Sequence, residues 1–384
     1  MASKGVRRLR SVVMSGSRNI PNSVIENTLL AISTFSDLSP KNVSSLLTSV
    51  SVLREKSPLV LREHLFTAVC RNATQATFRS LSGVDLARTA LSIGFLAKEL
   101  GSSGSHLRVS TDLLVLANER MPAIADRKAI HRLIRGFAMM RLPLSGALFD
   151  FFKSINTSVL GFEEAVFALK AGIDYGFHDK PLLSRLLMAE PVTCTPTAAR
   201  SLLYCAAMVG VPDVDGAVLN RLLSQCSVSQ EDSKSLIPLW ACTAMGFDVL
   251  NKVGTWGIVQ RGLSSSSARD REMASVIAKV PIPNREQLHQ SAKHERLRSD
   301  LERKYGTLVY EYEVIPGLVV DCANVEARLA IELDGPSHYL IDLSSGEQVF
   351  NGPTKRKRDQ IRNNGWTTVN INITRNRKWN RTQS

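Results

Sequence analysis

Residues 328–339 read RLAIELDGPSHY, and this stretch decides what kind of fold the C-terminal part of the chain adopts. Its first six residues have the character of a β-strand, which a Gly-Pro turn ends before His338. Glu332 and Asp334 stand two positions apart, so their side chains point to the same face of the strand. The stretch is therefore a candidate site as well as a structural element.

Further strands and a helix surround this stretch. The other predicted strands cover residues 307–315, 318–322 and 367–373. A basic segment over 354–364, which Gly365 closes as a C-cap, predicts a helix between the third and fourth strands. A charged helix over about 285–304 precedes the first strand. The C-terminal part is thus expected to be a small α/β module.

Residues 22–255 show helical periodicity, with apolar residues recurring at spacings of three and four. Four positions follow apolar helices and begin turns: Arg141, Gly176, Gly210 and Gly246. They are 35, 34 and 36 residues apart. A period near 35 made of two helices predicts an α-solenoid of the tetratrico- or pentatricopeptide type, with a non-repetitive helical bundle as the alternative.

The predicted domain organisation has four parts. They are a targeting segment over 1–21, a helical-repeat array over 22–255, a linker over 256–284, and a C-terminal module with a leading helix and a basic tail over 285–384. The linker is inferred from four consecutive serines at 264–267 and from the sequence Pro-Ile-Pro at 281–283.

The net charge of +13 over 384 residues sits at the two ends of the chain. Residues 1–25 carry five bases and no acid, and residues 352–384 carry nine bases against one acid, so the rest is net neutral. The Arg- and Ser-rich start is typical of a mitochondrial presequence, with a disordered basic tail as the alternative. The basic C-terminal end favours contact with a polyanion.

Other features exclude several classes of protein. The six cysteines are scattered without a C-x-x-C pair, which argues against a disulfide scaffold and a structural zinc site and favours a reducing compartment. Because no stretch approaches eighteen uncharged apolar residues, the sequence predicts no membrane span.

The candidate catalytic residues cluster in the module: Asp321, Glu332, Asp334 and His338. Carboxylates at strand ends are the ligands that Mg²⁺ or Mn²⁺ prefers, and such a metal activates water against a phosphodiester. Asp321 and Glu332 are the candidate metal ligands, and no other cofactor is expected. The alternative is structural, with the acids of the strand binding backbone donors, Arg328 or Lys355.

Residues 306–379 resemble the RAP domain, an RNA-binding module of eukaryotic organellar proteins. The matching segments are VD at 320–321, IELDGPSHY at 331–339, NGPTKRK at 351–357, NGW at 364–366 and KW at 378–379. RAP domains in turn resemble very-short-patch-repair endonucleases and other PD-(D/E)xK nucleases. The resemblance implies a restriction-endonuclease-like fold in which Asp321 and Glu332 match the metal-binding carboxylates.

The chain departs from the nuclease pattern at one position. That motif has a lysine two residues after the second acid, where this chain has Asp334. Lys355 on the next predicted helix is the candidate replacement. Helical repeats ahead of a RAP domain also resemble FAST-kinase-like and apicomplexan heptatricopeptide-type architectures, which implies work on mitochondrial RNA or the mitochondrial ribosome.

The expected function is therefore RNA binding in mitochondria, on ribosomal or messenger RNA. The protein would act in RNA processing or ribosome assembly, or as a component of the mitochondrial ribosome, with ribosomal or RNA-processing proteins as further partners. The expected RNA contacts are Lys355, Arg356, Lys357, Arg358, Arg362, Arg375, Arg377, Lys378 and Trp379. Trp366 is expected in the core. The alternatives are a metal-dependent endoribonuclease and a protein–protein adaptor whose solenoid groove holds a partner helix.

Overall fold

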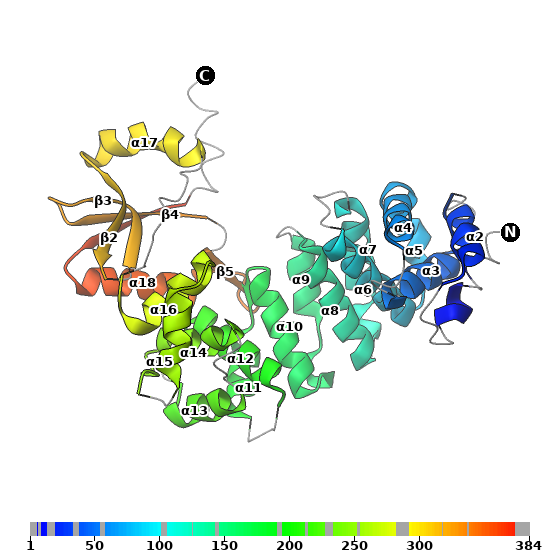
Figure 1. The fold of residues 1–384 in the computed structure, drawn as a ribbon, viewed down its shortest axis with the longest axis horizontal. Helices are drawn as coiled ribbons and strands as arrows, with labels where there is room; N and C mark the ends of the chain where they lie inside the picture. Colours follow the sequence, from blue (N-terminus) through cyan, green and yellow to red (C-terminus); the bar gives the residue numbers. More distant parts are fainter. Residues whose placement is uncertain are drawn as a thin grey trace. The chain divides into compact units, whose positions relative to one another are not determined.

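The structure is a computed structural model of the chain. It describes residues 6, 9–13, 20–33, 38–53, 58–100, 106–124, 126–142, 146–189, 194–211, 214–226, 233–251, 254–281, 292–316, 318–335 and 338–372. Over these residues the chain is mostly helical, with a small mixed sheet region near its C-terminus (Figure 1). It divides into two compact units, Met1–Phe177 and His178–Ser384.

None of the helices within the described ranges is both long enough and apolar enough to cross a membrane. Most of segment 1–21, which carries the targeting prediction, lies outside those ranges.

Helices make up the first unit. Their bounds are α2 Asn22–Ser33, α3 Pro40–Leu53, α4 Leu59–Asn72, α5 Gln75–Arg79, α6 Gly83–Glu99, α7 Leu107–Arg120, α8 Arg127–Met140, α9 Gly146–Ser154 and α10 Phe162–Asp174. Alternate helices pack in rows, because α6 contacts α3 and α8, α8 contacts α10, and α7 contacts α5 and α9. At the α6–α8 contact the two backbones nearly touch: a Cβ on Gly136 would lie 2.7 Å from the carbonyl oxygen of Ala90.

The helices begin and end where the sequence marks them. Ser82, Asp126 and Thr195 are N-caps whose side chains accept hydrogen bonds from backbone N–H groups of the next turn. The predicted turn residues all have left-handed backbones, with φ of 48° at Arg141 and of 84°, 68° and 88° at Gly176, Gly210 and Gly246. The turns predicted at these positions are therefore confirmed.

The second unit begins with six more helices. They are α11 Lys180–Met188, α12 Pro196–Val209, α13 Gly216–Gln225, α14 Leu236–Ala244, α15 Thr255–Leu263 and α16 Ala268–Ala278. Here too alternate helices pack together, α12 on α14 and α14 on α16. Helices α15 and α16 occupy most of the segment expected to be a linker. The serine run is the turn between them, and Ser267 caps α16 by accepting a hydrogen bond from the N–H of Asp270.

A four-stranded sheet follows, with the order β2-β3-β4-β7. Its strands are β2 Val309–Ile315, β3 Leu318–Asn324, β4 Leu329–Asp334 and β7 Thr367–Asn372. The first two pairings are antiparallel, and β4 and β7 are parallel because α18, Gly352–Asn363, carries the chain back across the sheet. All four predicted strands and the basic helix are confirmed, with ends shifted by two residues or fewer.

One hairpin was not predicted from the sequence. Strands β5, Tyr339–Asp342, and β6, Gln348–Phe350, pair between β4 and α18. His178 extends this hairpin, because its carbonyl oxygen accepts a hydrogen bond of 2.8 Å from the N–H of Leu343.

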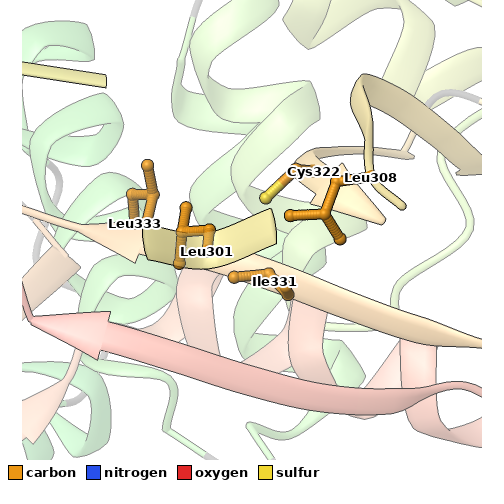
Figure 2. Packing of buried hydrophobic residues seen from close by; sticks show 5 residues of the cluster. All are labelled: Leu301, Leu308, Cys322, Ile331 and Leu333. Atoms are coloured by element: carbon orange, nitrogen blue, oxygen red, sulfur yellow. The ribbon is translucent and has the colours of Figure 1, made fainter. Parts of the chain in front are cut away.

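Two helices cover opposite faces of the four-stranded sheet (Figure 1). Figure 2 shows the apolar cluster under α17, Ala292–Tyr305, which is formed by Leu301, Leu308, Cys322, Ile331 and Leu333. The opposite cluster contains Ile361 of α18 with Val320, Ala323 and Ala330. Trp366 packs against this second cluster, as predicted.

The N-terminus of α18 packs on the C-terminal end of α12. A Cβ on Gly352, the first residue of α18, would lie 2.7 Å from the backbone nitrogen of Gly210, the C-cap of α12. Glycine at both positions lets the two helix ends meet at backbone distance. Helix α18 also contacts α14.

Candidate functional site

The structure brings the three predicted carboxylates of β3 and β4 together. The pairing of β3 with β4 ends at Cys322 and Ile331, and Asp321 and Glu332 are the next residues beyond that pair. Asp321 Oδ2 accepts a hydrogen bond of 2.6 Å from the N–H of Leu333, which ties the two strands together. Because Ile331 and Leu333 face α17, Glu332 and Asp334 face α18, as the two-residue spacing predicted.

Glu332 is buried, with 4% of its surface exposed, and forms an ion pair with Lys357 of α18. Burial raises its pKa from an ordinary value of 4.5 to about 7. The Lys357 ammonium opposes that rise, while the neighbouring Asp321 and Asp334 add to it. Glu332 is thus a carboxyl group that titrates near neutral pH inside a cluster of like charges.

Asp334 is completely buried, and its partners come from different elements. Asn370 of β7 donates a hydrogen bond of 2.6 Å from Nδ2 to its Oδ2. His338, which follows β4, places Nδ1 3.1 Å from Asp334 Oδ1, and this hydrogen bond is the main cause of the raised pKa of His338. The imidazole is therefore a positioned partner of Asp334.

A lysine joins the acids, but it is not the one expected. Lys355 is exposed, whereas Lys357 reaches Glu332. The sequence suggested Lys355 as the replacement for the motif lysine, and Arg328 or Lys355 as a partner of the strand acids. The observed partner of Glu332 is Lys357 instead. The reason is helical geometry, since two residues along a helix turn a side chain by about 200°.

The acids as arranged do not fit a metal ion. Each has an occupied oxygen: Asp321 accepts from Leu333, Glu332 pairs with Lys357, and Asp334 accepts from Asn370. Within the described ranges, no group of three or more His, Cys, Asp and Glu side chains could hold a metal ion. A cation bound between Asp321 and Glu332 would have to compete with the Lys357 ammonium.

The basic run 355–358 spreads around the first two turns of α18. Lys355 and, two turns later, Arg362 are exposed, and Arg362 Nε donates to Thr368 Oγ1 at 3.0 Å. Arg358 lies over the ring of Phe350, with 4.2 Å from its guanidinium carbon to the ring centroid. Arg356 is half-buried. The helix therefore has an exposed basic face and a second basic face turned toward the protein.

The remaining predicted RNA contacts, Arg375, Arg377, Lys378 and Trp379, lie outside the described residues.

A cavity of about 710 Å³ opens beside the acid cluster. Residues of α14 and α16 and the turn after α14 line one side, and residues near β4 and in α18 line the other. Glu332, His338 and Arg356 belong to its lining, together with Trp240 and Phe247 from the helical part. No sequence motif marked these two aromatic residues, because their approach to α18 depends on tertiary packing.

No protein-family model matches the chain, and a search of curated proteins finds no match.

Proposed function

We propose that the protein binds single-stranded RNA through α18 and the basic residues that follow it in the sequence. The observation that carries this proposal is the charge of α18, which has five bases against Asp359 as its one acid. Lys355 and Arg362 are exposed, so they are available to phosphate groups, which supply most of the affinity of such complexes. The C-terminal bases would extend the same contact.

The architecture supports a RAP-type protein. Each helix packs on the second helix along the chain, and turn residues with a left-handed backbone recur about every 35 residues. Both features are expected of an α-solenoid. The mixed sheet with a parallel β4-α18-β7 crossover and acids on two adjacent strands is compatible with a restriction-endonuclease-like module. With the acid-free N-terminal segment, this favours a mitochondrial protein that acts on ribosomal or messenger RNA, in processing, ribosome assembly or the ribosome itself.

Binding is favoured over RNA cleavage because of the state of the acids. A metal-dependent nuclease needs free carboxylate oxygens, and here a backbone, lysine or asparagine donor already occupies one oxygen of each acid. The adaptor alternative explains the near-neutral helical part, but it leaves the basic face of α18 without a purpose.

The first test is the salt dependence of RNA affinity. The double variant Lys355→Ala/Arg362→Ala should lower the slope of log affinity against log salt by about 0.7 per lost contact on single-stranded RNA. Affinity should fall to a similar extent for unrelated sequences, because phosphate contacts carry no sequence information. Lys98→Ala/Lys128→Ala removes the same charge from exposed positions on α6 and α8 and should leave the slope unchanged. An unchanged slope in the α18 variant would contradict the proposal.

Two further measurements test its other parts. Residues 1–30 fused to a reporter should carry it into mitochondria, and retention in the cytosol would contradict the organellar assignment.

Incubation of the protein with RNA and Mn²⁺ should give no cleavage. Cleavage by the wild type that Glu332→Gln abolishes would establish the nuclease alternative instead.

A further inference from the structure

We propose that the cavity between α14, α16 and α18 binds one nucleotide of an RNA strand, with its phosphate on Arg356 and its base against Trp240. This inference rests on the proposed function and names the part of the RNA that enters the protein. Four observations carry it: the unbalanced charge of the inner wall, the state of Arg356, the end of helix α18, and the aromatic residues opposite.

The charges of the cavity divide into a rim and an inner wall. Asp248, Glu272 and Lys279 line the cavity at exposed positions, where water solvates them. The inner charges are those of Arg356, Lys357 and Arg358, with Glu332 as the acid and His338 beside them. Lys357 is neutralised by its ion pair with Glu332. The inner wall therefore keeps an excess of positive charge.

Arg356 contributes to this excess, because it has no counterion among the described residues. Its Nη1 is shielded from solvent and has no hydrogen-bond acceptor among the described residues. Burial lowers its pKa, and no described acid acts on it in the opposite direction. Arg358 Nε also lacks a hydrogen-bond acceptor among the described residues, but the ring of Phe350 lies beneath its guanidinium group, and Asp334 and Asp359 act on its pKa. A guanidinium group that is half removed from water gains most from a bidentate acceptor, and a phosphate supplies one.

The first turn of α18 reinforces this preference for an anion. Pro353 and Thr354, next to the helix N-terminus, belong to the cavity lining. Pro353 has no N–H group and the N–H of Thr354 donates to Asn351 Oδ1, so it is the dipole of this twelve-residue helix that favours negative charge near its first turn. Arg356 and this helix end are held in place because Gly352 packs directly on the end of α12. The phosphate subsite is thus built on a rigid helix end.

The opposite wall fits the base of a nucleotide. Trp240 and Phe247 are half-buried and line the cavity from α14 and from the turn that follows it. Aromatic faces stack on unpaired bases, and this is the usual way in which proteins hold single-stranded RNA. A volume of about 710 Å³ lies within the range of sites that enclose a small organic ligand.

The test measures binding of 5′-AMP, adenosine and inorganic phosphate to the full-length protein by titration calorimetry. We expect AMP to bind at least tenfold more tightly than adenosine or phosphate, because it occupies both subsites. Arg356→Gln should weaken AMP binding at least tenfold, and Arg356→Lys should weaken it less, since it retains the charge but loses the bidentate geometry. Trp240→Leu should weaken AMP and leave phosphate unchanged. Lys128→Ala, at an exposed position on α8, is the control and should change none of these affinities.

Competition links the cavity to RNA. AMP should displace a single-stranded oligoribonucleotide from the wild type but not from the Arg356→Gln variant. Three outcomes would overturn the inference: no AMP binding, AMP binding that Arg356→Gln leaves intact, or AMP binding without displacement of RNA. If RNA binds with the salt slope predicted for Lys355 and Arg362 while AMP does not bind, the cavity assignment fails and the proposed function stands. Circular dichroism of each variant checks that the fold is retained.

Discussion

The two faces of the β2-β3-β4-β7 sheet have opposite characters although they share the same strands. On β4, Ile331 and Leu333 face α17 within an apolar cluster, while Glu332 and Asp334 face α18 among charged and polar partners. Alternation along one strand therefore builds a core and a candidate site back to back. Every site residue on β4 has a core residue as its neighbour in the chain.

The difference between the faces shows how a buried charged face is tolerated. An apolar face needs volume and contact, which any well-packed side chains supply. A buried acid needs a specific donor, because an unpartnered charge in the interior is costly. The donors on the α18 face come from three separate elements: Lys357 on α18, Asn370 on β7 and the backbone N–H of Leu333 on β4.

The largest effect is expected on the apolar face. Ile331→Ala removes methyl groups from a completely buried position and should lower the free energy of unfolding by about 2–5 kcal/mol. Native-state hydrogen exchange of β4 amides measures the loss locally. The matched control is Val309→Ala on β2, where 46% of the residue's surface is exposed. It should cost less than about 0.5 kcal/mol. Equal losses in both variants would contradict the description of this face as the core.

The charged face should respond to pH instead. Because the pKa of Glu332 is raised from 4.5 to about 7 on folding, the folded state binds the extra proton, and this stabilisation is complete below pH 4.5. It is lost as the pH rises through 7, and amounts to about 3 kcal/mol. His338, whose pKa is also raised, acts in the same direction but above pH 6.5. His131 and His178, whose pKa values are lowered by burial, act below 6.5, so the comparison with Glu332→Gln is what isolates Glu332.

The measurement is the free energy of unfolding of wild type and Glu332→Gln from pH 4.5 to 6.5. The wild type should lose stability relative to the variant as the pH rises. Glu326→Gln, at an exposed position in the β3–β4 turn, is the charge-matched control. Parallel curves for wild type and Glu332→Gln would show that Glu332 is not the buried acid described here.

A smaller effect is expected from the hydrogen bond between Asn370 and Asp334. Asn370→Ala leaves the buried Asp334 Oδ2 without its donor and should cost about 1–3 kcal/mol. Chemical denaturation checks this value. Asn363→Ala, at the exposed end of α18, should stay within about 0.5 kcal/mol of wild type. A neutral result for Asn370→Ala would mean that the α18 face tolerates an unpartnered acid, and the contrast between the faces would lose its physical basis.

Local sequence signals predicted the strands and the basic helix well, because each has a pattern that its own residues specify. The hairpin of β5 and β6 was missed, since its strands are three and four residues long and its pairing is set by contact with each other and with His178. The two helices α15 and α16 were mistaken for a linker because their serine-rich turn resembles low-complexity sequence.

The sequence alone determined which face of β4 carries the acids, where the helical turns fall, and that positive charge gathers on the helix before the last strand. These features follow from spacing and composition along the chain. Tertiary structure alone decided that Lys357 rather than Lys355 pairs with Glu332. It also decided that Asn370 donates a hydrogen bond to Asp334, and that Trp240 and Arg356 line the same cavity. Each of these joins residues more than twenty positions apart, and such partners are chosen by the packing of whole helices and strands, which the local pattern does not encode.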